Sequence, residues 1–76
     1  MRFNPETLRA ARLAAGLSRY SLANLAGLSL DAVYRIEDGR TKNPRFETVQ
    51  RLAQAAGVDV SSFFAPALPP TGSEAV

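Results

Sequence analysis

Residues 21–39 read SLANLAGLSLDAVYRIEDG and contain two short helical patterns separated by Gly27. Ser18 and Ser29 each precede one of these patterns, and hydroxyl side chains at such positions cap helix N-termini. The two predicted helices cover residues 19–26 and 30–38. Helices this short cannot bury a core alone. We therefore expect further helices around the pair, and a geometry of the pair that is set by something outside the protein.

Three further helices are predicted, one before this pair and two after it. Asn4 and Pro5 supply an N-cap acceptor and a first-turn proline for a helix that continues to about Ala15. Pro44 keeps the basic loop RTKNP out of helical conformation. Apolar spacing then predicts a helix over residues 46–56, and Asp59 caps a short last helix.

Apolar residues at helical spacing give one face of each predicted helix to a shared core. The predicted core residues are Leu8, Ala11, Ala15, Leu22, Ala23, Ala26, Val33, Ile36, Phe46, Val49, Leu52, Ala53, Ala56 and Phe63. With no repeat and no strand-like alternation, the sequence predicts an all-α domain of five helices over residues 1–65. Three prolines begin the remaining segment, residues 66–76, which we expect to be a disordered tail.

Composition restricts the chemistry. The 76 residues include no Cys and no His, so disulfides, thiolate chemistry and the usual zinc ligands are excluded, and we expect no metal and no cofactor. The carboxylates are scattered and no nucleophile has a plausible base, so we do not expect an enzyme. No secretory signal and no apolar run of about 20 residues occur, which favours a soluble cytoplasmic protein without membrane contact.

The central segment resembles the helix-turn-helix of the lambda-repressor-like family, of the Cro/repressor or Xre type, over roughly residues 8–64. That family has a small residue, a glycine and two β-branched aliphatic residues where this chain has Ala23, Gly27, Val33 and Ile36. Ala23 permits close helix approach, and Gly27 permits the positive φ of a sharp turn. Gly27 alone is equally compatible with an ordinary helix C-cap. The joint pattern, with IEDGR and RFETVQRLAQAAGV beyond it, carries the resemblance and implies a compact five-helix fold.

The resemblance implies that the predicted helix over residues 30–38 enters a DNA major groove, which is about 12 Å wide. Its base-reading residues would be Leu30, Asp31, Ala32, Tyr34 and Arg35. Arg35 suits the O6 and N7 atoms of guanine, and Leu30 suits a thymine methyl group. For Asp31 three roles stay open: an acceptor for cytosine, a partner that holds Arg35, or a first-turn carboxylate. Tyr34 either touches phosphate or sugar, or lies on the surface.

A second set of residues would contact the DNA backbone and so position the protein without reading sequence. These predicted phosphate-binding residues are Arg19, Tyr20, Arg40, Lys42, Asn43 and Arg45. Arg19 stands where the family commonly has Gln, and the alternative is a solvated surface arginine. The net charge of +2 is too small to indicate a partner. Five of the nine cationic residues, however, lie in the middle third of the chain, between residues 19 and 45.

The resemblance also implies a structural ion pair between Arg12 and Glu37. Relatives often dimerise through the last helix and the loop before it, which points to Val58, Val60 and Phe64 as interface residues. Phe63 is expected in the core, whereas the placement of Leu25 stays open. A homodimer on a palindromic operator would multiply the affinity of one weakly binding module.

The leading functional prediction is a sequence-specific regulator that binds double-stranded DNA, with no evident small-molecule ligand. A phage-type repressor, a restriction-modification controller and a toxin-neutralising autorepressor all fit the sequence. The alternative is a protein-binding adaptor built on the same fold, which the acidic and apolar residues Asp31, Asp38 and Leu30 keep open.

Overall fold

The computed structural model describes residues 2–64 and shows four α-helices followed by a 3₁₀ helix. In chain order these are α1 (Pro5–Ala14), α2 (Arg19–Ala26), α3 (Leu30–Glu37), α4 (Phe46–Ala56) and η1 (Val60–Phe64). No strand occurs within residues 2–64, and the predicted all-α fold is confirmed. The last predicted helix is the 3₁₀ element. The predicted tail over residues 66–76 lies outside the described residues.

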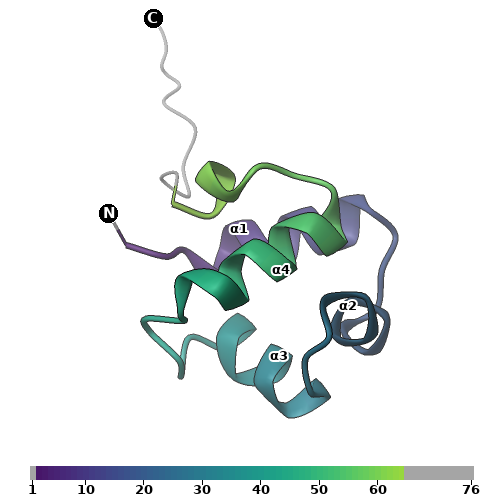
Figure 1. Cartoon of the computed structure of the whole chain (residues 1–76), viewed down its shortest axis with the longest axis horizontal. Coiled ribbons are helices and arrows are strands. Elements are labelled where there is room, and N and C mark those ends of the chain that lie inside the picture. The colour runs from purple at the N-terminus through teal and green to yellow at the C-terminus, as the bar shows by residue number, and fades with distance from the viewer. Residues whose placement is uncertain (1, 65–76) are drawn as a thin grey trace, which may run out of the picture.

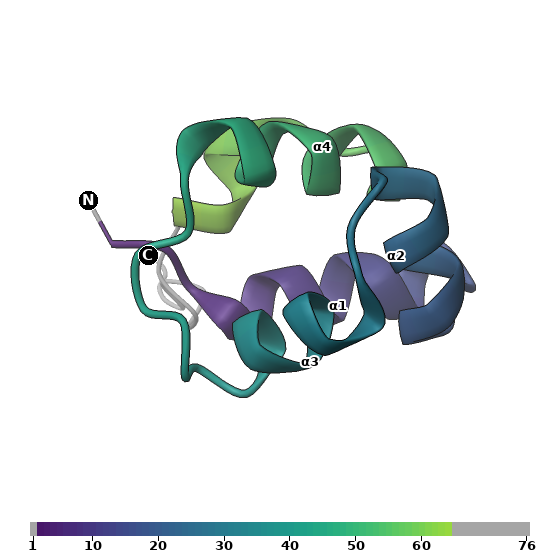
Figure 2. The same ribbon diagram turned by 60° about the horizontal axis from the view of Figure 1, so that its bottom comes forward.

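The helices enclose a core between two layers. In Figure 2, α4 lies across from α1 and α3, and α2 closes one end of the molecule. α2 packs against both α3 and α4, so it connects the two layers (Figure 1). The 3₁₀ helix packs against α1 and α4, and the backbone N–H of Asn4 donates to the carbonyl of Phe63 at 2.7 Å. In this arrangement one side of α3 faces the core and the other side faces solvent.

Local side-chain chemistry sets the ends of the first three helices. Asn4, Ser18 and Ser29 each accept a hydrogen bond from a backbone N–H in the first turn of the following helix. Gly27 adopts a left-handed φ of 70°, and its N–H closes the last turn of α2. Both interpretations of Gly27 therefore hold, because the same residue ends α2 and turns the chain into α3.

Most predicted core residues are buried, Ala11 is half-buried, and two are exposed. Leu8, Leu22, Val33, Leu52 and Phe63 are fully buried and come from all five elements. The prediction was wrong for two others. Phe46 is 63% exposed because it opens α4 on the solvent side, and Ala15 is exposed as the C-cap residue of α1.

Phe3 is a core residue that the sequence did not reveal. It precedes α1, where no helical spacing marks it, yet it is only 8% exposed. Its ring lies edge-on to the rings of Phe63 and Phe64, with centroids 5.8 and 6.0 Å apart. Such edge-to-face pairs are favourable beyond the area they bury. The extended segment before α1 is thereby fastened to the 3₁₀ helix.

A buried carboxylate joins three helices. Glu37, at the end of α3, has a fully buried side chain and accepts from Nε of Arg12 at 2.6 Å and from a terminal nitrogen of Arg12 at 3.3 Å. Arg12 also donates to the carbonyl of Leu17 at 2.8 Å. Nε of Arg19, the first residue of α2, reaches the second oxygen of Glu37 at 3.1 Å. The implied Arg12–Glu37 pair is therefore present, and Arg19 adds a third member.

Replacing Glu37 with Ala should lower the free energy of unfolding by about 3–5 kcal/mol, because Arg12 would stay buried without its partner. A domain of this length has about 4–11 kcal/mol in total, so this loss is a large fraction of its stability. Urea denaturation followed by circular dichroism measures the change.

The matched control is Glu47→Ala, which breaks an exposed pair with Arg51 whose side chains are 74% and 49% exposed. It should cost less than about 0.5 kcal/mol. The double variant Arg12→Met with Glu37→Met should recover much of the loss, since both buried charges are removed and the remaining Arg19 is 32% exposed. A Glu37→Ala protein as stable as Glu47→Ala would contradict a structural role for the buried carboxylate.

Candidate nucleic-acid interface

The outer face of α3 carries the residues predicted to read bases. Val33, Ile36 and Glu37 turn into the protein and are buried. The opposite side presents Leu30, which is 38% exposed, and Tyr34, which is 42% exposed. The structure brings all five predicted residues to this surface: Leu30, Asp31, Tyr34 and Arg35 are exposed, and Ala32 is half-buried. We call this surface the α3 face.

Two charged residues of the α3 face pair with each other. A terminal nitrogen of Arg35 lies 2.8 Å from a carboxylate oxygen of Asp31, one helical turn earlier. Of the three roles left open for Asp31, the geometry shows the contact with Arg35, and the carboxylate also lies in the first turn of α3. Both side chains are more than half exposed, so water screens the pair and another partner can replace it at little cost.

The predicted phosphate-binding residues after α3 lie together on the loop that leads to α4. Arg40, Lys42, Asn43 and Arg45 are all exposed. Arg40 lies 3.8 Å from the carboxylate of Asp38, a weak exposed contact. Arg45 occupies the N-cap position of α4 and offers no side-chain acceptor there, unlike the capping residues of the other helices.

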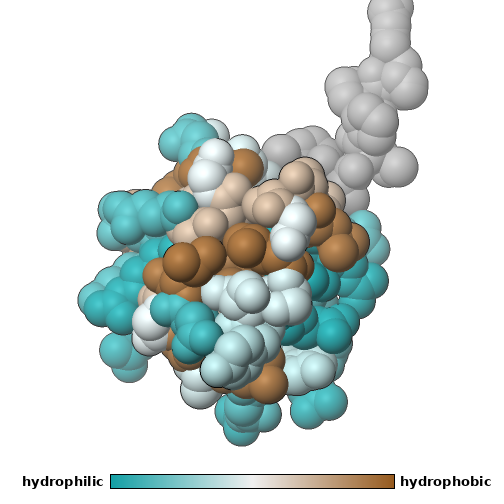
Figure 3. All heavy atoms as spheres, turned by 90° about the vertical axis from the view of Figure 1, so that its right-hand side faces the viewer, coloured by the Kyte–Doolittle hydropathy of each residue, from teal (hydrophilic) through white to brown (hydrophobic). Residues whose placement is uncertain are grey.

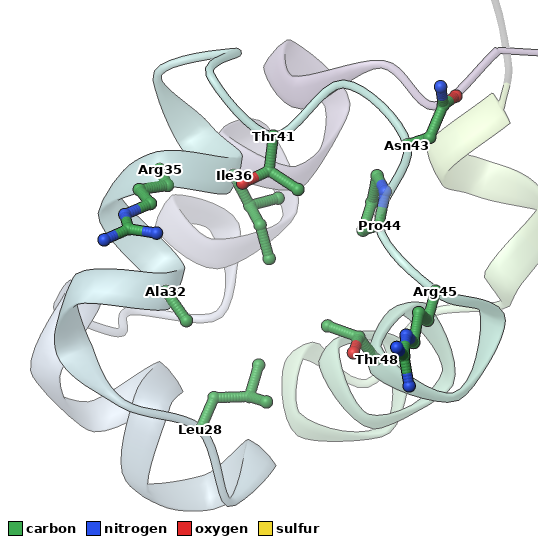
Figure 4. A pocket seen from close by; sticks show the side chains of 9 residues that line it. All are labelled: Leu28, Ala32, Arg35, Ile36, Thr41, Asn43, Pro44, Arg45 and Thr48. Carbon is green, nitrogen blue, oxygen red and sulfur yellow. The ribbon is translucent and has the colours of Figure 1, made fainter.

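A pocket of about 370 Å³ separates α3 from the start of α4. Figure 4 shows Leu28, Ile36, Pro44 and Thr48 directed into it, whereas Arg35 points away from it. Its walls are mainly apolar. Residues 2–64 contain no group of three or more His, Cys, Asp or Glu side chains that could hold a metal ion. The pocket offers shape and apolar contact beside the α3 face.

Arg19 is expected either to bind a DNA phosphate or to be a solvated surface arginine, and its contacts in the structure fit neither description fully. It is neither freely solvated nor directed only toward a phosphate, because it bonds Glu37 and lies 4.8 Å from the centroid of the Tyr34 ring. The bond to Glu37 is the main cause that holds the pKa of Arg19 above its usual value. Sequence reasoning missed both contacts, since the resemblance assigns Glu37 to Arg12 alone. Tyr20, its predicted neighbour at the phosphate, is 64% exposed.

The residues predicted for a dimer interface are only partly accessible. Val58, Val60 and Phe64 pack at the edge of the core, and Phe64 contacts Phe3. A more accessible apolar surface lies where α2, the end of α1 and the segment after α4 meet, which Figure 3 shows as an apolar band. Leu13 and Leu25 on these helices are 59% and 63% exposed, so Leu25 is not a core residue.

Comparison with known proteins places the chain in a family. Residues 6–62 match a helix-turn-helix domain family. The restriction-modification controller protein C.AhdI from Aeromonas hydrophila is 33% identical, with a TM-score of 0.74, and the match covers 79% of this chain and 89% of that protein. The chain matches no curated protein sequence.

Two matches concern much longer chains. PhpD in its cadmium-containing form is 29% identical, with a TM-score of 0.69, and a hydroxyethylphosphonate dioxygenase variant is 30% identical, with a TM-score of 0.68. Each covers 91% of this chain but only 15% of the longer one, so the similarity concerns a small part of those proteins. Within residues 2–64, no helix has the length and apolar character that crossing a membrane requires.

The helix-turn-helix match extends over most of the chain, and the controller protein shares its fold along nearly the whole of its own length. Both agree with the glycine turn, the buried Val33 and Ile36 and the solvent-facing side of α3. The chain belongs to the lambda-repressor-like, Xre-type helix-turn-helix family and is a DNA-binding transcriptional regulator.

Proposed function

We propose that this protein is a repressor or autorepressor that reads a palindromic operator as a homodimer, with the α3 face of each copy in the DNA major groove. The observation that carries the proposal is the α3 face itself, on which Leu30, Asp31, Tyr34 and Arg35 are exposed to solvent. Among the contexts that the sequence left open, the similarity to a restriction-modification controller protein favours that one.

Recognition would proceed through two kinds of contact. Arg35 would exchange Asp31 for the O6 and N7 atoms of a guanine, which accept two hydrogen bonds from one guanidinium group. Leu30 at the N-terminal end of α3 would lie against a thymine methyl group. The cationic loop before α4 would bind the phosphates that border the groove and so set the register of α3 without reading sequence.

Arg35→Ala should weaken binding to the preferred operator by about 5- to 150-fold and relax selectivity at one base position in each half-site. The operator is obtained by selecting bound duplexes from a random pool, and affinities for its single-base variants are measured by fluorescence anisotropy. Arg9→Ala, an exposed cation on α1, is the control and should leave the base preference unchanged. Equal selectivity in both variants would remove Arg35 from the reading set.

The loop cations should appear in the salt dependence of binding. With about five phosphate contacts in each copy, the logarithm of the association constant should fall with the logarithm of salt concentration at a slope of about −4 to −5 per bound copy. Arg45→Ala should make that slope less negative by about one unit, because one phosphate contact is lost. It should weaken binding to every duplex alike.

The same titration tests the adaptor alternative. An adaptor would show a flat salt response on duplex DNA and no preferred site in the selection. Asp31 and Leu30 on the α3 face are the features that would then contact protein instead. That pair of results would replace the DNA-reading proposal.

The proposed homodimer would use the apolar surface around Val58, extended by Val60 and Phe64. Val58 is half-buried beside the core, so a carboxylate there would meet apolar surface in a dimer and partly reach water in a monomer. Val58→Asp should therefore shift sedimentation equilibrium toward monomer and lower operator affinity at least tenfold. Val58→Thr keeps the shape and is the matched control. A dimer unchanged by Val58→Asp would remove Val58 from the interface.

A further inference from the structure

Arg19 lies between two side chains of α3. Its Nε donates to the buried carboxylate of Glu37 at 3.1 Å, and its guanidinium carbon is 4.8 Å from the ring centroid of Tyr34. Glu37 lies on the core side of α3, and Tyr34 lies on the α3 face. The first residue of α2 is thus held against α3.

The two contacts restrict Arg19 in different ways. The hydrogen bond to Glu37 engages Nε–H, one of the five N–H donors of a guanidinium group. The aromatic ring attracts the cation, whose guanidinium carbon lies over the ring. The side chain is still 32% exposed. An arginine held in this way has already lost most of the rotamer freedom that binding an anion would otherwise remove.

Tyr34 is in turn committed to this contact. A ring beneath a guanidinium group is less able to turn toward a base edge, although it lies on the same face as Arg35. We propose that Tyr34 is a positioning residue that acts through Arg19: its ring holds the guanidinium group ready for a DNA backbone phosphate, and Tyr34 does not read a base. This inference rests on the proposed DNA-reading function and revises the predicted role of Tyr34.

The proposal predicts a particular pattern of affinities. Tyr34→Ala should weaken binding roughly threefold to tenfold, and by the same factor for the operator and each of its single-base variants. Tyr34→Phe keeps the aromatic face and should bind like the wild type. The salt slope should stay almost unchanged in Tyr34→Ala, because the charge of Arg19 remains, whereas Arg19→Ala should reduce it by about one unit.

A double-mutant cycle tests whether the two side chains act together. Adding Tyr34→Ala to Arg19→Ala should cause no further loss of affinity if the tyrosine works only through the arginine. Because Arg19→Ala also removes a partner of Glu37, the cycle is repeated with Arg19→Lys, which keeps the charge and loses the planar guanidinium group. Urea denaturation of each variant determines its folded fraction, by which the measured affinities are corrected.

Two results would overturn the inference. One is a Tyr34→Ala protein whose affinities for single-base variants change unequally, which would make Tyr34 a base reader. The other is a double variant whose loss of affinity equals the product of the losses in the two single variants. Wild-type protein without any preferred duplex would instead contradict the proposed function.

A measurement without DNA separates these failures. In the free protein, the NMR signal of the Arg19 Nε–H should be displaced by the ring of Tyr34, and the displacement should vanish in Tyr34→Ala but persist in Tyr34→Phe. An unchanged signal in Tyr34→Ala would show that the stacked contact is absent, whatever the DNA result.

Discussion

The geometry of this domain depends on one buried carboxylate. Glu37 ends α3, and its two oxygens bind Arg12 from α1 and Arg19 from α2. Burying a single charge would be prohibitive, but hydrogen-bonded cations on both sides compensate much of the desolvation. The result is a directional constraint. The hydrogen bonds to Glu37 act together with the burial of Val33 and Ile36 to fix the rotation of α3 about its own axis.

That rotation decides which residues of α3 are exposed. With Val33 and Ile36 on the core and Glu37 held by its cations, Leu30, Tyr34 and Arg35 have no direction left except outward. The motif thereby explains why the centre of the chain consists of two eight-residue helices. A single longer helix could not keep one side of residues 30–37 in the core and also place α2 across their end.

Much of this could be predicted because the determinants are local. Asn4, Ser18 and Ser29 act within one helical turn, and Gly27 needs only its own φ. Burial of Phe3 could not be predicted, since it depends on a 3₁₀ helix at the other end of the chain. Phe46 fits the apolar spacing of α4 but stands in its first turn, where the core does not reach.

The same distinction applies to the candidate site. The outward set on α3 follows from helical periodicity once Val33 and Ile36 are inside. The contact of Arg19 with Tyr34 joins two helices and depends on their crossing angle, which no pattern in the sequence specifies. Helical periodicity predicts which residues lie on a surface. Which of them contact one another depends on how the helices pack in the folded protein.

The pairing of Arg35 with Asp31 gives the α3 face a built-in competitor. A carboxylate tethered one turn away, 2.8 Å from the guanidinium group, is always present at high local concentration. An incoming acceptor can replace this exposed, water-screened pair at little cost, and a flat pair of acceptors makes two hydrogen bonds to the guanidinium group where a randomly placed phosphate oxygen makes one. Asp31 thus occupies, in the free protein, the guanidinium group that the proposed contact with a guanine would use.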